Sequence, residues 1–159
     1  MKIGILGGGQ LGRMLIQDAL KYDDEIHVLD PNADCSCAII SVFTKGNFND
    51  KQDVLDFGQD KDVVSIEIEH VNIEGLEELE QQGIKVIPNS SIIKIIQLKI
   101  LQKQFYKHHQ IPSPDFQIIQ SLKEEIRIGF PFVQKLNTGG YDGKGVQVIQ
   151  SESDVAKMW

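Results

Sequence analysis

The segment with the richest chemical possibilities runs from Thr138 to Gly145 and reads TGGYDGKG, with four glycines in its last seven residues. Glycine lets backbone amides approach a ligand closely and adopts positive φ at little cost. A run of such amides beside a lysine, here Lys144, forms a flexible cradle for nucleotide phosphates. The alternative is an ordinary hairpin turn with spare glycines. The spacing departs from the Walker pattern, in which Gly-Lys-Ser/Thr leads into a helix.

Two short apolar segments must position this loop. Residues 130–135 read FPFVQK and are predicted to form a strand that ends in Lys135, whose ammonium we expect to project into a cleft. Residues 146–149 read VQVI, and their alternation predicts the return strand. The sequence therefore predicts a hairpin that can close over ATP.

A second glycine motif, Gly7–Gly12, reads GGGQLG between a predicted strand and a predicted helix. Amides at the start of a helix attract anions. One interpretation is a dinucleotide site in which Asp30, at the end of the second strand, binds a ribose hydroxyl. The other is a tight turn packed against the sheet. Gln10 places a polar amide at the mouth of this turn, which suits a substrate better than a pyrophosphate.

Two carboxylates, Glu67 and Glu69, stand at the carboxyl end of a predicted buried strand over Val63–Ile68. Ligands of open α/β sheets bind outside the carboxyl ends of the strands. Strand alternation would send both carboxylates to one face, where either could hold ribose hydroxyls or an amine. A solvated strand end explains the same residues equally well.

Composition narrows the class of protein. The 159 residues are 41% hydrophobic and carry a net charge of −7, which argues against nucleic acid as the main partner. No window reaches the roughly 18 apolar residues of a membrane span. Cys35 and Cys37 fit neither a Cys-x-x-Cys redox motif nor a zinc site. We therefore expect loop thiols in a reducing cytoplasm, and no metal ligands among these residues.

Strand and helix signals alternate, which predicts an α/β fold with a mostly parallel sheet. Prolines at Pro112 and Pro114 mark the expected domain boundary. Predicted strands are Lys2–Leu6, Ile26–Asp30, Ser41–Thr44, Val63–Ile68, Ile84–Ile87 and Asp115–Ile119; predicted helices are Gln10–Lys21, Asp50–Phe57, Ile73–Gln82, Ser91–His109 (in one or two pieces), Leu122–Ile128 and one that starts at a Ser151 cap.

In order along the chain stand GGGQLGR at 7–13, EIEH at 67–70, Lys99 with Gln102 and Lys103, and TGGYDGKG at 138–145. This set resembles the 5-(carboxyamino)imidazole ribonucleotide synthase family, the ATPase subunits of bacterial phosphoribosylaminoimidazole carboxylase, within the ATP-grasp superfamily. The resemblance spans nearly the whole chain.

The resemblance implies a Rossmann-like, parallel-sheet pre-ATP-grasp domain followed by the beginning of an ATP-grasp domain. We expect residues 1–95 to form the substrate-binding domain, 96–112 a connecting helix, and 113–159 an incomplete ATP-grasp domain. Because the chain stops inside a predicted helix at Trp159, we expect the front portion of a longer protein that turns over no ATP by itself. Relatives of this kind are usually homodimers.

The implied reaction is the ATP-dependent carboxylation of 5-aminoimidazole ribonucleotide with bicarbonate, giving ADP and phosphate, in de novo purine biosynthesis. Magnesium would bridge the ATP phosphates, with protein ligands expected beyond residue 159. The earlier glycine turn would seat the sugar phosphate, and the later one would fold over the triphosphate in a common cleft.

Site roles follow by resemblance alone. Without the resemblance, Lys99 is better explained as part of a solvated helix face. The chain departs from the family at Val146, where glutamine usually follows the loop. The implied roles are ATP contacts from Lys99, Lys135, Gly140, Tyr141, Asp142, Gly143, Lys144 and Gly145; catalysis by Tyr141 and Lys144, reaching bicarbonate or the ribonucleotide; and ribonucleotide binding by Gln10, Leu11 and Glu69.

Three other functions compete. An NAD(P)-dependent oxidoreductase explains Gly7–Gly12 and Asp30, but leaves the second glycine loop and Lys135 without purpose. A regulatory nucleotide-binding module would bind ligand without chemistry. A sister ATP-grasp carboxylate–amine ligase would act on another small amine or acid, against which Gln10-Leu11 and Tyr141-Asp142 argue by resemblance.

Overall fold

The computed structural model describes residues 1–121, 124–140 and 143–156. The chain divides into two compact units, Met1–Lys94 (unit 1) and Ile95–Trp159 (unit 2). Each unit is described by itself below.

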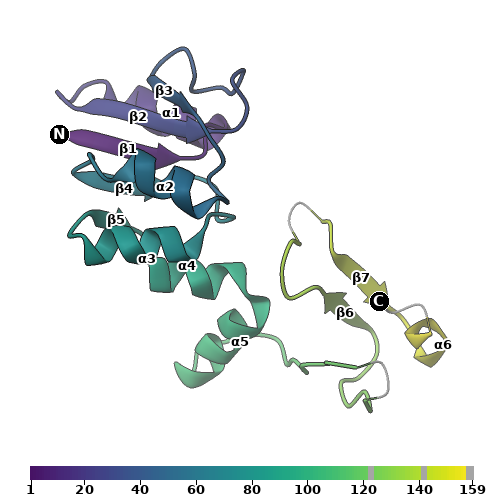
Figure 1. Cartoon of the computed structure of the whole chain (residues 1–159). Helices are drawn as coiled ribbons and strands as arrows, with labels where there is room; N and C mark the ends of the chain where they lie inside the picture. Colours follow the sequence, from purple (N-terminus) through teal and green to yellow (C-terminus); the bar gives the residue numbers. More distant parts are fainter. Residues whose placement is uncertain (122–123, 141–142, 157–159) are drawn as a thin grey trace. The chain divides into compact units, whose positions relative to one another are not determined.

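Unit 1 is built on a five-stranded sheet in the order β3-β2-β1-β4-β5, and every neighbouring pair is parallel (Figure 1). The strand order reverses between β1 and β4, so the topological switch point of this α/β sheet lies at the carboxyl ends of these two strands. The predicted parallel α/β fold is therefore confirmed. The strands are β1 (Lys2–Leu6), β2 (Glu25–Asp30), β3 (Val42–Lys45), β4 (Val63–Ile66) and β5 (Lys85–Ile87).

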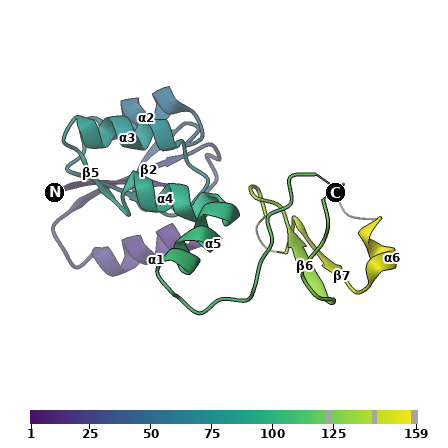
Figure 2. The same cartoon turned by 90° about the horizontal axis from the view of Figure 1, so that it is seen from below.

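Helices cover both faces of this sheet. Figure 2 shows α1 (Gln10–Ala19) on one face, and α2 (Lys51–Gly58) and α3 (Ile73–Gln81) on the other. Right-handed crossovers explain this, because β1-α1-β2 and β4-α3-β5 run in opposite directions from the centre of the sheet. Side chains cap two helices: Asp50 accepts the amides of Gln52 and Asp53, and Asn72 accepts that of Gly75.

The core of unit 1 lies between the sheet and its helices. Strand residues Ile5, Val28 and Val64 are at most 1% exposed, as are Val54 from α2 and Leu76 from α3. Burial of this kind stabilises a fold by roughly 25 cal/mol per Å² of apolar surface. The carboxyl half of β1 and the residue Val64 of β4 thus lie in this core.

Leu11, Met14, Leu15 and Ala19 have the spacing of one helix face, which predicts that this face of α1 packs on the sheet, but the structure turns another face inward. Leu11, Met14 and Leu15 are 67%, 55% and 49% exposed, whereas Gly12 and Ile16 are buried. Gly12 explains the orientation, because a Cβ there would lie 3.2 Å from both the Gly7 carbonyl and Cys37 Sγ. The small residue lets the helix approach the turn closely, and the apolar stripe is left outside.

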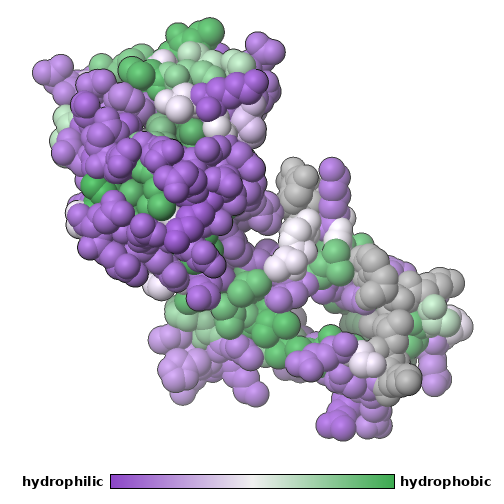
Figure 3. All heavy atoms as spheres, viewed as in Figure 1, coloured by the Kyte–Doolittle hydropathy of each residue, from purple (hydrophilic) through white to green (hydrophobic). Residues whose placement is uncertain are grey.

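Unit 2 is an antiparallel hairpin with short helices and little core. Its elements are α5 (Lys99–His108), β6 (Phe132–Lys135), β7 (Val146–Ile149) and α6 (Glu152–Val155), and α4 (Ser90–Gln97) leads into it. Ile149 is the only buried residue among those described in this unit. Figure 3 shows apolar side chains gathered over α5, which has no buried residue of its own.

Two predictions for this region were wrong, and the helix predicted to start at Ser151 is present as α6. Asp115–Ile119 is not a strand. The segment is held by the Gln117 side chain and not by backbone pairing: its Nε2 donates to Glu125 O at 2.6 Å, and its Oε1 accepts the Arg127 amide at 2.7 Å. Residues 124–128 of the predicted Leu122–Ile128 helix are not helical, and residues 122 and 123 lie outside the described residues. Ser151 holds the N-cap position of α6 but makes no side-chain cap bond.

The long predicted helix over Ser91–His109 does form two pieces. Leu98 separates α4 from α5, with φ −107° and ψ 106° in the extended region. A residue in this conformation ends the helical hydrogen bonding of α4 and serves as the N-cap position of α5.

Candidate functional site

The glycine turn Gly7–Gly9 and the segment Glu67–His70 follow the two strands at the switch point. Leu6 and Ile66 are register partners at the ends of β1 and β4, so both segments leave the sheet at the same edge. The amide of Glu67 donates to Leu6 O at 2.9 Å and that of Gly7 to Leu29 O at 3.0 Å. This edge is where open α/β sheets bind ligands.

Glu67 fills the space that the glycines of the motif leave open. A Cβ on Gly7 would lie 2.7 Å from its Oε2, and one on Gly9 would lie 2.7 Å from its Oε1. A Cβ on Gly12 would lie 3.4 Å from its Cγ. The three glycines therefore make room for a side chain of the same chain, and Gly7 also needs its φ of 100°.

Asp30 holds the turn from the other side. Its Oδ2 accepts the amide of Gly8 at 2.7 Å, and its Oδ1 accepts the amide of Asn32 at 2.8 Å. The carboxylate that a nicotinamide dinucleotide would need for its ribose is thus bonded to the turn itself. This geometry disfavours the oxidoreductase interpretation of the glycine motif.

The two cysteines pack under the same turn. Cys35 Sγ lies directly against the position that a Cβ on Gly8 would take, and the amide of Cys37 donates to Gly8 O at 3.2 Å. Cys37 is fully buried, and this burial raises the pKa of its thiol to about 11. The prediction of ordinary loop thiols missed this structural role.

The predicted ribonucleotide ligands lie around the turn. Gln10 and Leu11 begin α1 and are exposed. Glu69 is half-buried, with Oε1 3.6 Å from His70 Nε2. Because β4 ends at Ile66, strand alternation does not place the two glutamates on one face: Glu67 turns to the glycines, and Glu69 stays beside His70. Their ligand roles remain predictions.

In unit 2 the structure ties Lys99 to the later glycine loop. The amide of Lys99 donates to Asn137 O at 3.0 Å, and that of Ile100 donates to Asn137 Oδ1, also at 3.0 Å. Asn137 thereby caps the N-terminus of α5 from the residue just before Thr138. Sequence reasoning missed this cap, although asparagine beside a glycine run was an available signal.

The neck of this loop is closed by backbone contacts. The amide of Leu136 donates to Gly145 O at 3.0 Å, and a Cβ on Gly140 would lie 3.1 Å from Lys144 O. Gly143 and Gly145 have φ of 78° and 64°, which favours glycine at both positions. Two predicted site residues, Tyr141 and Asp142, lie outside the described residues.

The hairpin presents one apolar face with a cation at its end. Val133 pairs with Val148, and Lys135 pairs with Val146, so these four side chains share a face. The three valines are 52%, 55% and 42% exposed in the order Val133, Val148, Val146, and Lys135 is exposed. Exposed apolar side chains beside an ammonium can pack against a purine ring and pair with attached phosphates.

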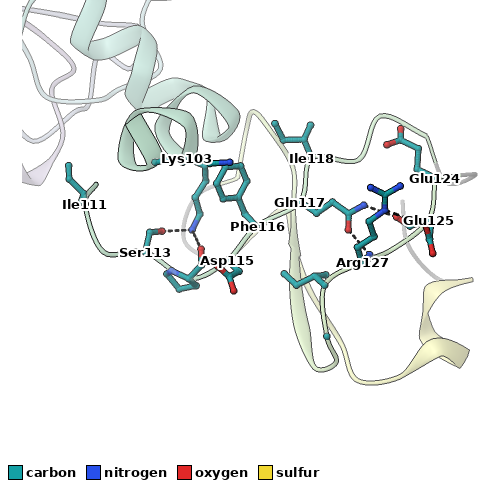
Figure 4. A pocket seen from close by; sticks show the side chains of 14 residues that line it. Lys103, Ile111, Ser113, Asp115, Phe116, Gln117, Ile118, Glu124, Glu125 and Arg127 are labelled. Carbon is teal, nitrogen blue, oxygen red and sulfur yellow. Dashed lines mark hydrogen bonds and ion pairs between the residues drawn. The ribbon is translucent and has the colours of Figure 1, made fainter. Parts of the chain in front are cut away.

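A hollow of about 830 Å³ in unit 2 lies away from these residues (Figure 4). Lys103 donates to Ser113 Oγ at 2.6 Å and to Pro114 O at 3.1 Å there, and its ammonium lies 5.7 Å from the Phe116 ring. Lys103 therefore holds the segment that follows α5. Acidic and basic side chains mix around this hollow, and it contains none of the predicted site residues.

The described part of the chain contains neither a metal-ligand cluster nor a membrane-spanning helix. No group of three or more His, Cys, Asp or Glu residues there could hold a metal ion. None of the helices there has both the length and the apolar character needed to cross a bilayer.

Comparison with known proteins places these features in context. Residues 1–97 match the ribonucleotide synthetase preATP-grasp domain, and residues 104–159 match the ATP-grasp domain. The N5-carboxyaminoimidazole ribonucleotide synthase of Staphylococcus epidermidis is 37% identical over 163 residues, which cover 99% of this chain and 43% of that protein. The chain thus spans less than half the length of this relative.

Solved structures agree. The N5-carboxyaminoimidazole ribonucleotide synthetase of Thermotoga maritima superimposes with a TM-score of 0.89 at 34% identity, over 99% of this chain and 43% of that one. The Aspergillus clavatus N5-carboxyaminoimidazole synthase, solved with ADP and 5-aminoimidazole ribonucleotide, has a TM-score of 0.83 at 29% identity, over 98% and 42% of the two chains.

Proposed function

The chain belongs to the ribonucleotide synthetase preATP-grasp family, and from that premise we propose that it acts in the ATP-dependent carboxylation of 5-aminoimidazole ribonucleotide. The observation that carries the proposal is the match, over 98% of the chain, to a synthase solved with ADP and this ribonucleotide. Both glycine motifs of the sequence fall within the matched part.

The proposed chemistry has three steps. A bicarbonate oxygen attacks the γ-phosphorus of ATP, and ADP leaves. The resulting carboxyphosphate splits into carbon dioxide and phosphate. The amine of the ribonucleotide then attacks the carbon dioxide and loses a proton, which gives the carbamate. Catalysis of phosphoryl transfer is mostly positioning and electrostatic stabilisation, so cationic side chains and backbone amides are the groups required.

We propose that unit 1 binds the ribonucleotide through Gln10, Leu11 and Glu69. Their support is their place around the switch-point turn, where Gln10 is exposed and the Glu69 carboxylate is half-buried. A carboxylate accepts hydroxyl or amine hydrogens, and a glutamine amide both donates and accepts. These groups complement the hydroxyls of a ribose and the hydrogens of an amine.

Unit 2 is proposed to bind ATP on the exposed hairpin face. The valines would pack against the purine, and Lys135 would meet the phosphates. Lys99 is supported as a second phosphate contact by its bonding to Asn137 at the base of the glycine loop. Gly140–Gly145 would cover the phosphates, moving on a lid-like timescale.

Tyr141, Asp142 and Lys144 are proposed to act at the tip of the same loop. Lys144 would neutralise charge on bicarbonate or the ribonucleotide as the loop closes. Magnesium, when bound, would supply positive charge that offsets the charge on the ATP phosphates. The described residues offer lysines rather than a carboxylate cluster at the hairpin, so we assign the ion no ligand and no step here.

The remaining partners are also proposals. Bicarbonate is the carboxyl donor, the reaction is placed in the cytoplasm, and the protein is proposed to be a homodimer. The exposed apolar side chains of α1, with Met14 at 55% and Leu15 at 49%, support a partner surface on unit 1. Sedimentation equilibrium of the purified chain would report its mass directly.

A fusion tests the function. Residues 1–159 are joined to the part of the Staphylococcus epidermidis synthase that follows its matched region, and ADP release is measured with and without 5-aminoimidazole ribonucleotide. We expect ADP release that depends on both the ribonucleotide and bicarbonate, and that falls in a Lys135→Met variant but not in a Lys85→Met control. A fusion that is folded but releases no ribonucleotide-dependent ADP would contradict the proposal.

A further inference from the structure

We propose that Glu67 is a specificity-determining residue: it fills the anion site of the Gly7–Gly12 turn with the chain's own carboxylate and so excludes phosphate groups from it. This inference concerns the turn alone. It stands on the geometry of unit 1 and does not depend on the carboxylation reaction.

The turn has the features that elsewhere bind phosphate. It connects a strand to the N-terminus of α1, a helix of ten residues, and carries glycines at Gly7, Gly9 and Gly12. In dinucleotide folds the middle glycine lets the pyrophosphate approach the backbone, and the helix N-terminus attracts it. The motif alone therefore predicts an anion site.

The structure puts a carboxylate in that place. Glu67 Oε1 and Oε2 lie 2.7 Å from the Cβ positions of Gly9 and Gly7, and the Glu67 Cγ lies 3.4 Å from that of Gly12. The N-cap residue Gly9 supplies no side-chain cap, and the first turn of α1 contains no acidic residue. Glu67 is thus the anion at this helix end, although it follows the neighbouring strand β4.

A second carboxylate closes the opposite side. Asp30 Oδ2 already accepts the amide of Gly8 at 2.7 Å, which removes one donor from any incoming phosphate. The partial positive charge of a helix N-terminus is about half an elementary charge, and one carboxylate outweighs it. A phosphate entering the turn would meet two like charges at contact distance, which is unfavourable even at a partly solvated site.

Ligand groups that suit this turn are uncharged or cationic hydrogen-bond donors. Hydroxyl and amine hydrogens can bond to the Glu67 carboxylate where phosphate oxygens cannot. If the proposed function holds, the sugar phosphate that the sequence places in this turn must lie elsewhere, with the ribose or amine end of the substrate facing Glu67.

The test is a titration of the 159-residue chain with inorganic phosphate, followed by the backbone amide signals in ¹⁵N NMR, with chloride of equal ionic strength as the blank. Amides of Gly8, Gly9 and Gln10 should stay unshifted in the wild type. They should show saturable shifts in Glu67→Gln, with affinity at least about tenfold higher, because a like charge in contact has been removed. Glu74→Gln, the same charge change at an exposed residue of α3, should behave like the wild type.

Saturable phosphate shifts at these amides in the wild type would overturn the inference. The inference would also be overturned if the Glu67→Gln chain gave a dispersed, folded spectrum but bound phosphate no better than the wild type. Glu67→Met, which is neutral and of similar length, repeats the measurement made on Glu67→Gln. If both variants lose their dispersed spectra, the wild-type titration still decides. Neither ATP nor ribonucleotide is used, so failure here leaves the result of the fusion assay unaffected.

Discussion

Asp30 accepts the backbone amide of Gly8 at 2.7 Å and thereby ties the end of β2 to the turn after β1. The same carboxylate accepts the amide of Asn32 at 2.8 Å. Both of its oxygens are committed to the backbone of unit 1. Asp30, whose position at the end of a strand suggests a ligand contact, thus has a structural role.

The first prediction concerns this carboxylate. Asp30→Asn replaces one of the two acceptor oxygens with a carboxamide NH2 that faces an N–H donor, and so leaves a half-buried backbone amide without an acceptor. We expect a loss of about 1–3 kcal/mol in the free energy of unfolding. Urea denaturation followed by far-UV circular dichroism measures it. Asp34→Asn, in an exposed position of the same loop, should change stability by less than about 0.5 kcal/mol.

The second prediction tests the packing of Cys35 on Gly8. Gly8→Ala would place a methyl group onto Cys35 Sγ and within 3.2 Å of Val28 Cγ1. Overpacking of this kind costs about 1–3 kcal/mol. Combining it with Cys35→Ala should restore part of that loss in the same urea experiment. Strict additivity of the two single changes would show that the contact does not exist in solution.

The third prediction separates the two thiols by pH. Cys37 is fully buried and its pKa is raised to about 11, so its thiolate is scarce at pH 8. Because the thiolate is the nucleophile, alkylation of Cys37 should be slow at pH 8 and should accelerate as the pH rises toward 11. Cys35, which is partly exposed, should react first. Mass spectrometry after timed iodoacetamide treatment measures the extent of alkylation at each cysteine. Equal alkylation rates at pH 8 would contradict the burial of Cys37.

The fourth prediction addresses ATP on unit 2. Lys135→Met keeps the length of the side chain but removes the ammonium that we propose meets the phosphates. A hydrogen bond to a charged group contributes about 1.5–3 kcal/mol, so ATP should bind at least about tenfold more weakly to the fusion protein. Equilibrium dialysis with labelled ATP measures this. Lys107→Met, on the exposed side of α5, is the matched control and should leave affinity unchanged.

The fifth prediction compares the two units by hydrogen exchange. Amides of β1, β4 and α3 lie in a buried core and should exchange only on unfolding of unit 1. Among the described residues of unit 2 only Ile149 is buried, so amides of α5 and the hairpin should exchange far faster. Comparable protection of the amides in the two units would show that unit 2 is stabilised by contacts beyond the burial of Ile149.

Local patterns were sufficient for much of this protein. The alternation of strand and helix signals predicted the parallel α/β sheet of unit 1, and its elements lie within a few residues of their expected positions. The break between α4 and α5 and the hairpin around the glycine loop were also predicted. These features depend on residues close together in the chain, where periodicity and glycine placement carry the information.

The tertiary structure decided what the motifs hold. The order of the strands puts β4 beside β1, and only then does Glu67 reach across Gly7, Gly9 and Gly12 from some sixty residues away. The buried face of α1 follows from how closely Gly12 can approach the turn, which helical spacing cannot report. Contacts between distant residues depend on the packing of whole elements, so a motif read along the chain identifies a turn but not its occupant.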